Sequence, residues 1–494
     1  MGNVMVQRQP EPRTNSSLRG ASAARFLRQF IGGSLIAGIA ACGNLAGPDY
    51  QRPDSPGKST WRDGLGVEVA DEYSVRPDWW RGFNDPYLDQ LIQRALDNNI
   101  DLQILGARIG VAEAAIGQAN AARLPTVDAA LGANAQQSGG GQAVTSYSGA
   151  TAIGWELDIW GKLEKGVRAQ EAELRATGAD WRAGYLTLIS DLSSLYFTLR
   201  QYDEQLYRQR QALVRNEQIA GIYRSLHDEG VAPQTRVLQQ EAEIDALRNG
   251  LLELERLRTL AENALATLLG MPAGELRVPT GNLSDDISLV AVPGGLPSDL
   301  LTRRPDIVAA EYRVLQAHEL VGQARLARLP SFSLTSGLGT TSGDLSGLLQ
   351  SWTLGLRPTI SIPIFDPAVS ARIKVSEASS RVVEQEYRRT VIRAFEEVEN
   401  ALVNLDARRQ QRQQIVALRN KLQRVAAEVE AQLREGLVSQ LEVLESQRSL
   451  LSAELALLSN QRQLLDDTVQ LYKALGGGWP AEQVRAADAP GSVN

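Results

Sequence analysis

Apolar and polar residues alternate with a period of two in two stretches of the chain, near residues 147–159 and 352–364. Such alternation gives a β-strand one apolar face and one polar face. The apolar positions are Tyr147, Ile153, Trp155, Leu157 and Ile159 in the first stretch, and Trp352, Leu354, Leu356, Ile360, Ile362 and Ile364 in the second. Each stretch follows another strand-like segment across a loop such as SGGGQ. The pattern therefore predicts two β-hairpins, at 126–160 and 331–365.

The segments after the hairpins have the composition of long helices. Residues 368–435 include neither Gly nor Pro and are rich in Ala, Leu, Glu, Gln and Arg, which favour the helix. One helix over this segment would be roughly 100 Å long. The corresponding segment 162–229 contains four glycines, at which it can bend. Each long helix is predicted to end at a glycine, Gly230 or Gly436, which can adopt the left-handed conformation.

A return helix is predicted after each of these glycines, at 233–269 and at 437–475. The second return helix has a heptad seam, with steps of four and three residues. The seam consists of Leu437, Leu441, Leu444, Leu451, Leu455, Leu458, Leu465 and Val469, with Arg448 and Arg462 in its gaps. A second stripe recurs every seven residues and consists of Val443, Leu450, Leu457, Leu464 and Leu471. Two stripes imply neighbours on both sides, in an antiparallel hairpin of a bundle or in a wall of helices around a central space.

The motif ARLP occurs twice, and the spacing of its two copies indicates an internal duplication. The copies end at Pro125 and Pro330, 205 positions apart (330 minus 125). Trp160 and Phe365, which close the predicted hairpins, are also 205 positions apart (365 minus 160). We therefore predict two tandem structural repeats. They divide the chain into repeat 1 at 85–270, a linker at 271–289, repeat 2 at 290–476 and a C-terminal tail at 477–494.

The predicted hairpins provide only four strands. Four strands cannot close a barrel in a membrane, because open edges would leave backbone groups unpaired in hydrocarbon. Three copies of the chain would supply twelve strands, an even number of the kind found in outer membrane barrels. The alternative is a soluble protein with a small sheet packed on a helical bundle. The polar strand positions fit a water-filled lumen and a solvated sheet surface equally well.

Residues 1–41 have the features of a secretory signal peptide. Residues 1–28 contain five Arg and one Glu, and the apolar segment that follows is shorter than the ~20 residues of a membrane-spanning helix. The motif IAAC, which ends at Cys42, resembles a bacterial lipobox, in which the cysteine thiol is acylated. Gly43 stands where an Asp would retain a lipoprotein at the inner membrane, which implies export to the outer membrane. Residues 42–84 are then a lipid anchor and an extended tether.

The composition argues against nucleic-acid binding and catalysis. The formal net charge of −7 is unsuited to a surface that binds nucleic-acid phosphates. Cys42 is the only cysteine, which excludes a disulfide within one chain, and His227 and His318 have no second histidine or cysteine nearby for a metal site. No serine lies in a G-x-S-x-G motif. We expect no enzyme activity and no cofactor.

A series of short motifs resembles the TolC-like outer membrane efflux proteins, in particular the lipoprotein branch that serves resistance-nodulation-division pumps. The motifs are Cys42 with GPDYQRP, Trp79–Trp80 followed by FNDPYLDQLI (83–92), the two ARLP segments, LDIWGK (157–162), RRPDI (303–307), PIFD (363–366) and YKALGGGW (472–479). Each motif alone is weak, but their order and the doubled arrangement make the resemblance specific, and it covers nearly all of the predicted mature chain.

The resemblance implies a mainly α-helical fold with a β-barrel part. It implies a homotrimer whose twelve-stranded barrel lies in the outer membrane, anchored there by lipid. An α-helical coiled-coil tunnel would continue the barrel across the periplasm to an adaptor (membrane fusion) protein and an inner-membrane pump. Such a protein is a passive duct for small molecules, with energy supplied by the pump. The rival interpretation is a structural coiled-coil envelope lipoprotein without a transport lumen.

The resemblance also implies a gate near the second turn glycine. In the family, acidic residues six and nine positions after this glycine narrow the periplasmic end of the tunnel, and here they are Glu442 and Glu445. Being three residues apart, they share a helix face. Three copies would place six carboxylates around one axis, where bound cations would relieve the repulsion. The alternative is a pair of solvated surface charges. Arg236 holds the corresponding position after Gly230, and we hypothesise that it pairs with a gate carboxylate.

The two tips, 229–233 and 435–439, resemble the segments that contact the adaptor. The residues expected at this contact are Gly230, Val231, Gly436, Leu437 and Ser439. The alternative is a plain turn between two helices, which would require the same glycines. Arg304 and Pro305 are predicted to mark a helix start, because Pro is favoured in the first turn.

Overall fold

The computed structural model describes residues 47–54, 57, 61, 78–137, 139–283 and 300–477. The chain forms two compact units, one built around the β-strands and one entirely helical in its regular structure. The predicted signal peptide and Cys42 lie outside the described residues, as do much of the predicted tether, linker and C-terminal tail.

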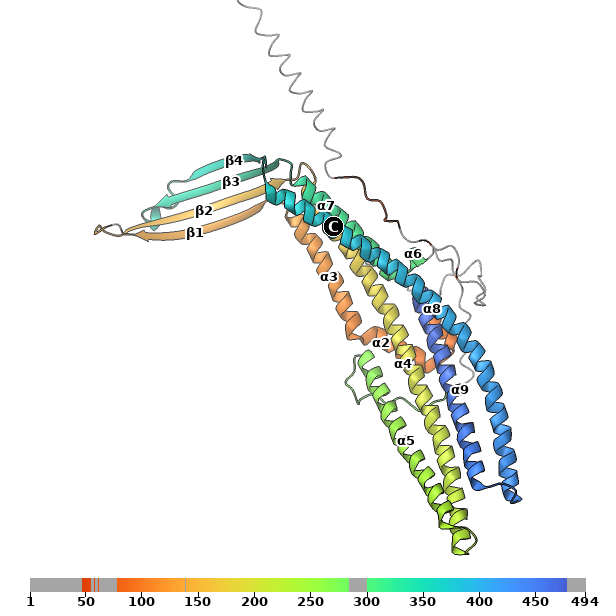
Figure 1. The fold of residues 1–494 in the computed structure, drawn as a ribbon. Helices are drawn as coiled ribbons and strands as arrows, with labels where there is room; N and C mark the ends of the chain where they lie inside the picture. Colours follow the sequence, from red (N-terminus) through yellow and green to blue (C-terminus); the bar gives the residue numbers. More distant parts are fainter. Residues whose placement is uncertain are drawn as a thin grey trace, which may run out of the picture. The chain divides into compact units, whose positions relative to one another are not determined.

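The first unit contains a four-stranded antiparallel sheet in the order β1-β2-β3-β4 (Figure 1). The strands are β1 (Thr126–Gln136), β2 (Val144–Leu157), β3 (Ser331–Ser342) and β4 (Thr353–Ser361). The two hairpins lie side by side, joined where β2 pairs with β3. This order leaves β1 and β4 as the two edges of the sheet.

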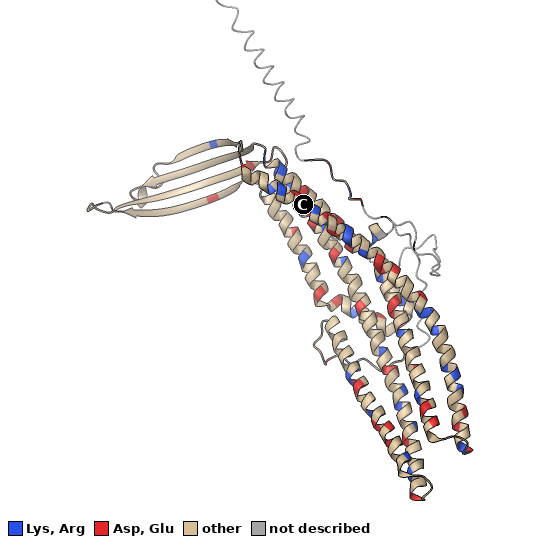
Figure 2. Ribbon diagram, in the orientation of Figure 1, with Lys and Arg blue, Asp and Glu red and all other residues tan. Residues whose placement is uncertain are grey.

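The register of the sheet confirms the predicted alternation, because paired residues share a face. One face is mainly apolar on all four strands, with Ser and Thr at a few positions, and includes Val127, Leu131, Tyr147, Ile153, Trp155, Phe332, Leu334, Leu338, Leu354, Leu356 and Ile360. The other face consists mainly of Gly, Ala, Ser and Thr, and its charged residues are Asp128, Glu156 and Arg357. Figure 2 shows how few charges the sheet carries.

Both hairpins end earlier than the alternation predicts. Strand β2 ends at Leu157 and β4 ends at Ser361, whereas the sequence pattern continues to 160 and 365. After β2, the Asp158 carboxylate accepts a hydrogen bond from the Glu164 N–H at 2.8 Å, and Gly161 has a φ of 75°. The chain therefore turns into the following helix instead of continuing the ladder.

The helices are paired in length between the two repeats. Helix α4 (Lys162–Asp228) has 67 residues and α8 (Pro367–Arg434) has 68, and both are uninterrupted. The return helices α5 (Gln234–Leu268) and α9 (Gln440–Ala474) have 35 residues each. The helices that precede the hairpins have 22 residues each and are α3 (Ile100–Ala121) and α7 (Pro305–Leu326). The shorter helices are η2 (Trp79–Phe83), α2 (Pro86–Asn98), α6 (Leu300–Arg303) and η4 (Leu345–Gly347).

The two apolar stripes of α9 face two different neighbours in the helical unit. Leu458, Leu465 and Val469, from the heptad seam, belong to the main core with residues of η2, α2, α4 and α5. Leu464 and Leu471, from the second stripe, pack with residues 398–405 of α8. The predicted neighbours on both sides of this helix are therefore present within the chain.

Aromatic and ionic contacts hold η2 and the segment after α5 against the long helices of the helical unit. Trp79 stacks on Tyr472, with ring centroids 4.8 Å apart, and joins η2 to α9. Asp203, buried on α4, pairs with Arg200 at 3.1 Å and with Arg258 of α5 at 2.6 Å. Arg258 also donates to the Val278 carbonyl at 2.8 Å, so this network holds the segment after α5 on the bundle.

Arg304 and Pro305 mark a helix start, as the sequence predicts. Pro305 is the first residue of α7, and the buried Arg304 guanidinium donates to the Ala474 carbonyl at 2.9 Å and to Glu397 at 2.6 Å. Across the described residues, no helix combines the length and the apolar character of a membrane span.

Candidate functional site at the helix tips

The two hairpin tips of the helical unit share one backbone geometry. Gly230 has a φ of 75° and Gly436 a φ of 73°, the left-handed conformation that glycine adopts without strain. In each tip the glycine N–H and the next N–H bond back to helix carbonyls: Gly230 to His227 at 2.9 Å and Val231 to Leu226 at 2.8 Å. The same pattern joins Gly436 to Leu433 and Leu437 to Gln432. These are Schellman motifs, which satisfy the last carbonyls of the long helices.

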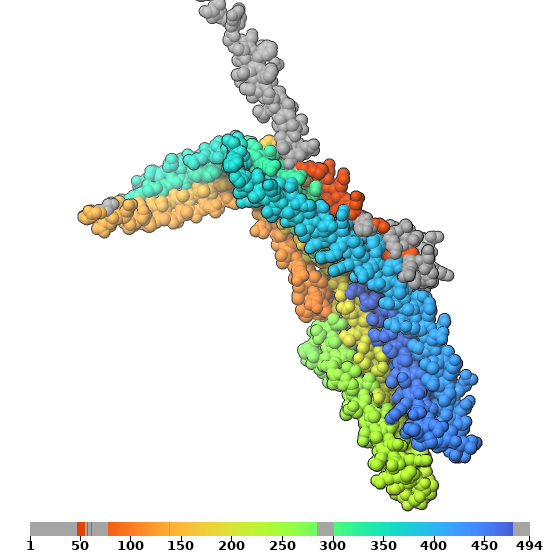
Figure 3. Space-filling model, in the orientation of Figure 1, coloured from red at the N-terminus to blue at the C-terminus, as the bar shows by residue number. Residues whose placement is uncertain are grey.

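Each tip presents one large aliphatic side chain to solvent. Val231 is 71% exposed and Leu437 is 69% exposed. Both follow the left-handed glycine, so the Schellman turn fixes where they project. Figure 3 shows both tips as free ends of the helical unit. These are the residues expected to contact an adaptor.

Glu442 takes part in the N-terminal cap of α9. Its Oε1 accepts hydrogen bonds from the Ser439 N–H at 3.2 Å and from the Ser439 hydroxyl at 2.9 Å, in a capping box. A capping box satisfies backbone donors that the first helical turn leaves free. Glu442 is nevertheless exposed.

Glu445 lies one turn further along α9 and is also exposed. Its charge acts on Arg448, whose guanidinium forms an ion pair with Glu243 of α5. The Glu243 bond is the main cause of the raised pKa of Arg448. Within one chain, Arg448 is therefore already paired with Glu243, and Glu445 adds only a weaker electrostatic effect on it.

Arg236 lies beside Tyr223. Burial raises the pKa of the Tyr223 phenol, and the charge and hydrogen bonding of Arg236 oppose this rise. The Tyr223 hydroxyl donates to Gln440 Oε1 at 2.6 Å in a buried bond that joins α4 to α9. The ion pairs of the described residues include none from Arg236 to Glu442 or Glu445. The pairing of Arg236 with a gate carboxylate stays a hypothesis, one that the contacts inside a single chain do not supply.

A ladder of polar contacts, not predicted from the sequence, joins the α4–α5 hairpin to α9. Its members are Tyr223–Gln440, Glu243–Arg448, Arg208–Glu454 at 3.5 Å, and Ser194–Asp466. One signal was present in the sequence. Arg448 and Arg462 interrupt the heptad seam, and an arginine in such a seam is a candidate for an ion pair with a neighbouring helix. In the structure Arg448 pairs with Glu243, and Arg462 lies 3.8 Å from Asp466.

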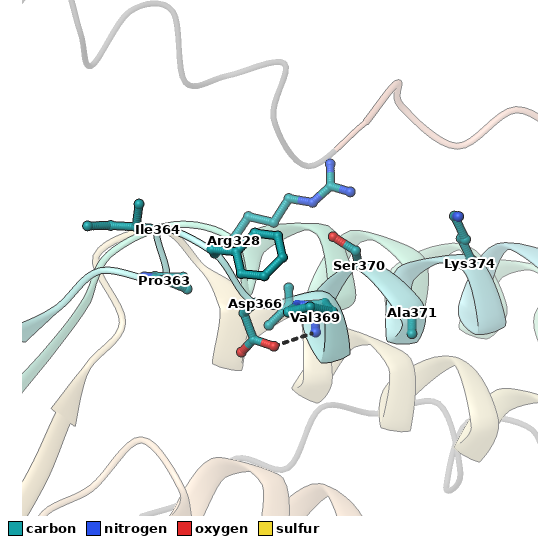
Figure 4. Close-up of a pocket in the computed structure, with 10 residues that line it drawn as sticks. Arg328, Pro363, Ile364, Asp366, Val369, Ser370, Ala371 and Lys374 are labelled. Carbon is teal, nitrogen blue, oxygen red and sulfur yellow. Dashed lines mark hydrogen bonds between the residues drawn. The ribbon is translucent and has the colours of Figure 1, made fainter.

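A second surface feature is an open groove where β4 leads into α8 (Figure 4). Asp366 caps α8 by accepting the Ala368 N–H at 2.8 Å and the Val369 N–H at 3.2 Å. Ile364 is 93% exposed and Phe365 is 88% exposed on this groove. Neighbouring apolar side chains with this exposure are typical of a surface that contacts protein or lipid. The groove contains no group arranged for catalysis.

The described part of the chain contains no cluster of three His, Cys, Asp or Glu side chains able to hold a metal ion. His227 instead bonds through Nδ1 to the Ala232 carbonyl at 3.0 Å within its own tip.

Comparison with known proteins gives a consistent assignment. The sequence profile of the family described as "Outer membrane efflux protein" matches residues 91–271 and again 296–477. The second match begins 205 residues after the first (296 minus 91), the spacing that relates the two repeats. The chain is 32% identical over 470 residues to a probable efflux pump outer membrane protein, TtgC, of Pseudomonas putida, covering 90% of this chain and 95% of that protein.

A second relative is a probable outer membrane lipoprotein, SilC, of Salmonella typhimurium. It is 31% identical over 465 residues, which cover 92% of this chain and 99% of the relative. Among solved structures, the outer-membrane channel OprN superposes with a TM-score of 0.78 at 29% identity, covering 88% of this chain and 99% of that one. Sequence and fold thus agree over nearly the full length of each relative.

Proposed function

Because the chain belongs to the outer membrane efflux protein family, we propose that three copies of it form a passive duct that accepts small molecules from an inner-membrane pump. Its role as an outer membrane efflux channel follows from its relatives and from its fold. The trimer, the gate and the partner proteins are the parts that we propose.

The observation that carries the trimer is the four-stranded sheet. One of its faces is mainly apolar on all four strands, and its two edges, β1 and β4, have no partner strand within the described residues. A sheet with such a face is stable in a membrane only if its edges are paired, because unpaired N–H and C=O groups are costly in hydrocarbon. Three copies close twelve strands, and the face rich in Gly, Ser and Thr then lines a water-filled lumen.

The gate is proposed at the α9 end of the second tip. Glu442 and Glu445 are both exposed there and lie one turn apart. In a trimer, three pairs of carboxylates would surround the axis, where they would attract cations and narrow the entrance. The capping box supports this role because it holds the Glu442 side chain in one orientation. Arg236 is the cation proposed to pair with a carboxylate from a partner subunit.

The proposed partners are inferred from the two helix tips and from the lipobox cysteine. The exposed Val231 and Leu437 offer small apolar contacts for a periplasmic adaptor, which would link the duct to a resistance-nodulation-division pump. The acylated Cys42 would anchor each copy in outer membrane lipid. No cofactor is required for passive transport.

Reconstitution tests the duct against the rival, a coiled-coil envelope rod without a lumen. The mature lipidated protein is purified in mild detergent, its particle mass is measured, and it is then added to a planar bilayer. A trimeric particle with discrete, voltage-driven ion conductance supports the duct. A monomeric particle, or a trimer without conductance in the bilayer, rejects it.

A further inference from the structure

The sheet contains its own example of a junction between two repeats. Strand β2, the last strand of repeat 1, pairs with β3, the first strand of repeat 2. In that junction Trp155 lies opposite Leu334, and Glu156 lies opposite Ser333. The free edges β4 and β1 are again a last strand and a first strand. In a closed ring, β4 of one copy would meet β1 of the next.

The two repeats correspond at a spacing of 205 residues on both sides of this junction. Strand β1 begins at Thr126 and β3 at Ser331, a difference of 205 (331 minus 126). The helices that follow the hairpins begin at Lys162 and Pro367, again 205 residues apart (367 minus 162). The positions of the β2–β3 junction therefore have counterparts on β4 or β1, except Tyr147, Leu157 and Ser342, whose counterparts lie one residue beyond a strand end.

We propose that β4 of one copy pairs with β1 of a second copy in the register that β2 and β3 adopt inside the chain. This inference rests on the proposed trimer and adds its subunit register. Adding 205 to Trp155 gives Ile360, and subtracting 205 from Leu334 gives Ala129, so Ile360 lies opposite Ala129 of the partner subunit. The same shift places Ser361 opposite Asp128 of the partner subunit and Thr353 opposite Gln136 of the partner subunit.

The transferred register is consistent with both faces of the sheet. A slip of one residue would turn every side chain to the wrong face, yet here the faces match. Ile360 meets Ala129 and Leu356 meets Ala133 of the partner subunit on the apolar face, and Arg357 meets Gly132 of the partner subunit on the polar face. All nine residues of β4 are paired in this register, and only Thr126 and Val127 of β1 have no opposite residue on β4, which favours this register.

A rival register, shifted by two residues, comes from a difference between the hairpins. Thr126 pairs with Gly154, but its counterpart Ser331 pairs with Ser361 and not with Thr359, the residue 205 after Gly154. If this displacement carried over to the subunit junction, Ser361 would lie opposite Ala130 of the partner subunit. Thr353 and Leu354 would then extend beyond Gln136, where β1 ends.

Strand tilt also favours the proposed register. A row of paired residues climbs four positions from β1 to β3, since Thr126 aligns with Thr335 and not with its counterpart Ser331. In the proposed register the same row climbs two more residues between β3 and β1 of the partner subunit, which gives six residues per copy. Six residues per copy are roughly 20 Å along strands that together span roughly 19 Å. The resulting tilt of about 46° is close to the ~35–45° of membrane barrels. The rival register gives about 54° by the same geometry.

Paired cysteines test this register in the full-length lipidated protein. The variant A130C/T359C places thiols opposite each other in the proposed register, and A130C/S361C does so in the rival register. All three positions are exposed and lie on the polar face. After oxidation we expect covalent dimers and trimers from the first variant and little cross-linking from the second. The single variants A130C, T359C and S361C control for any contribution of Cys42.

Particle mass in mild detergent, measured on the same unoxidised samples, separates the two levels of the proposal. Preferential cross-linking of A130C/S361C, or no cross-linking of either variant in a particle of trimer mass, overturns the register and leaves the trimer in place. A particle of monomer mass rejects the proposed trimer itself, and the register with it.

Discussion

The two candidate gate carboxylates differ in their contacts within the chain. Glu442 bonds to Ser439 and caps α9, whereas Glu445 acts at a distance on an arginine that is paired with Glu243. Replacement of either carboxylate by an amide keeps the side-chain shape and removes the charge. Glu442→Gln should therefore change the stability of the helical unit more than Glu445→Gln, because only Glu442 caps α9. The two substitutions should reduce cation binding at the proposed gate to a similar extent.

For this pair we expect E442Q/E445Q channels to lose most of their sensitivity to divalent cations. In the proposed trimer, six carboxylates around the axis would bind such cations and reduce the current. The measurement is single-channel conductance in monovalent salt with and without added divalent cation. The matched control is E428Q/E430Q, which removes two exposed charges from α8. An unchanged cation block in E442Q/E445Q would show that both acids are surface charges.

At the scale of single elements, replacing glycine by alanine should change stability in opposite directions in a glycine turn and in a helix interior. Gly436 has a φ of 73°, and a Cβ built there meets nothing within 4 Å. Gly221 lies inside α4 and is equally free of neighbours, but it has helical backbone angles. The difference between the two sites is therefore conformational, not steric.

We expect Gly436→Ala to destabilise the helical unit by about 1–2 kcal/mol, the cost of a left-handed L-residue. Gly221→Ala should stabilise it by about 1 kcal/mol, because Ala favours the helix interior. Denaturant unfolding followed by far-ultraviolet circular dichroism measures both. If the two variants moved in the same direction, the Schellman turn would not be what ends α8.

The partly buried Asp467 of α9, which lies near Arg408 of α8, provides a pH-dependent test. Burial raises the pKa of the Asp467 carboxyl, the nearby Asp466 adds to the rise, and Arg408 opposes it. A raised folded pKa means that folding disfavours the charged form. The stability contributed by the protonated acid is complete below its unfolded pKa and is lost as pH rises through the folded pKa.

Asp467→Asn should therefore raise the melting temperature at neutral pH, and this gain should shrink as pH falls toward the acid's unfolded pKa near 4. The measurement is thermal unfolding across this pH range. Asp466→Asn is the control. It removes the neighbouring carboxylate, which accepts a hydrogen bond from the Ser194 hydroxyl, and leaves Asp467 in place. A loss of stability in Asp467→Asn at neutral pH would mean that the attraction to Arg408 outweighs burial.

Elements defined by local sequence patterns could be predicted from the sequence, whereas contacts between distant parts of the chain could not. Period-two alternation and the absence of helix breakers are local properties, so they predicted the strands and the uninterrupted α8. The end of β2 was missed because Asp158 and Gly161 form a turn within an apolar pattern that continues past it. The bond between Tyr223 and Gln440 joins residues 217 positions apart, and only packing brings them together.

At the scale of the whole molecule, duplication explains why one chain provides both tips, both hairpins and equal helices. The spacing of 205 was visible in ARLP, and the same spacing separates the two matches to the family profile. The pairing of Arg236 was carried over from the family pattern alone. Inside one chain its neighbour is Tyr223, so a pairing with a gate carboxylate would require contacts between the subunits of the proposed trimer.

The exposed tips separate the duct's own conductance from its cooperation with an adaptor. Val231→Asp and Leu437→Asp place charges at positions that are 71% and 69% exposed, so folding should be unaffected. We expect these variants to conduct in a planar bilayer like the wild type but to fail to restore efflux in cells that lack the native protein, because an apolar contact with the adaptor is lost. Val231→Ala and Leu437→Ala are the milder comparisons and should retain part of the efflux. Full efflux with both Asp substitutions combined would place the adaptor elsewhere on the helical unit, whereas loss of conductance in the bilayer would show that the tips also shape the entrance.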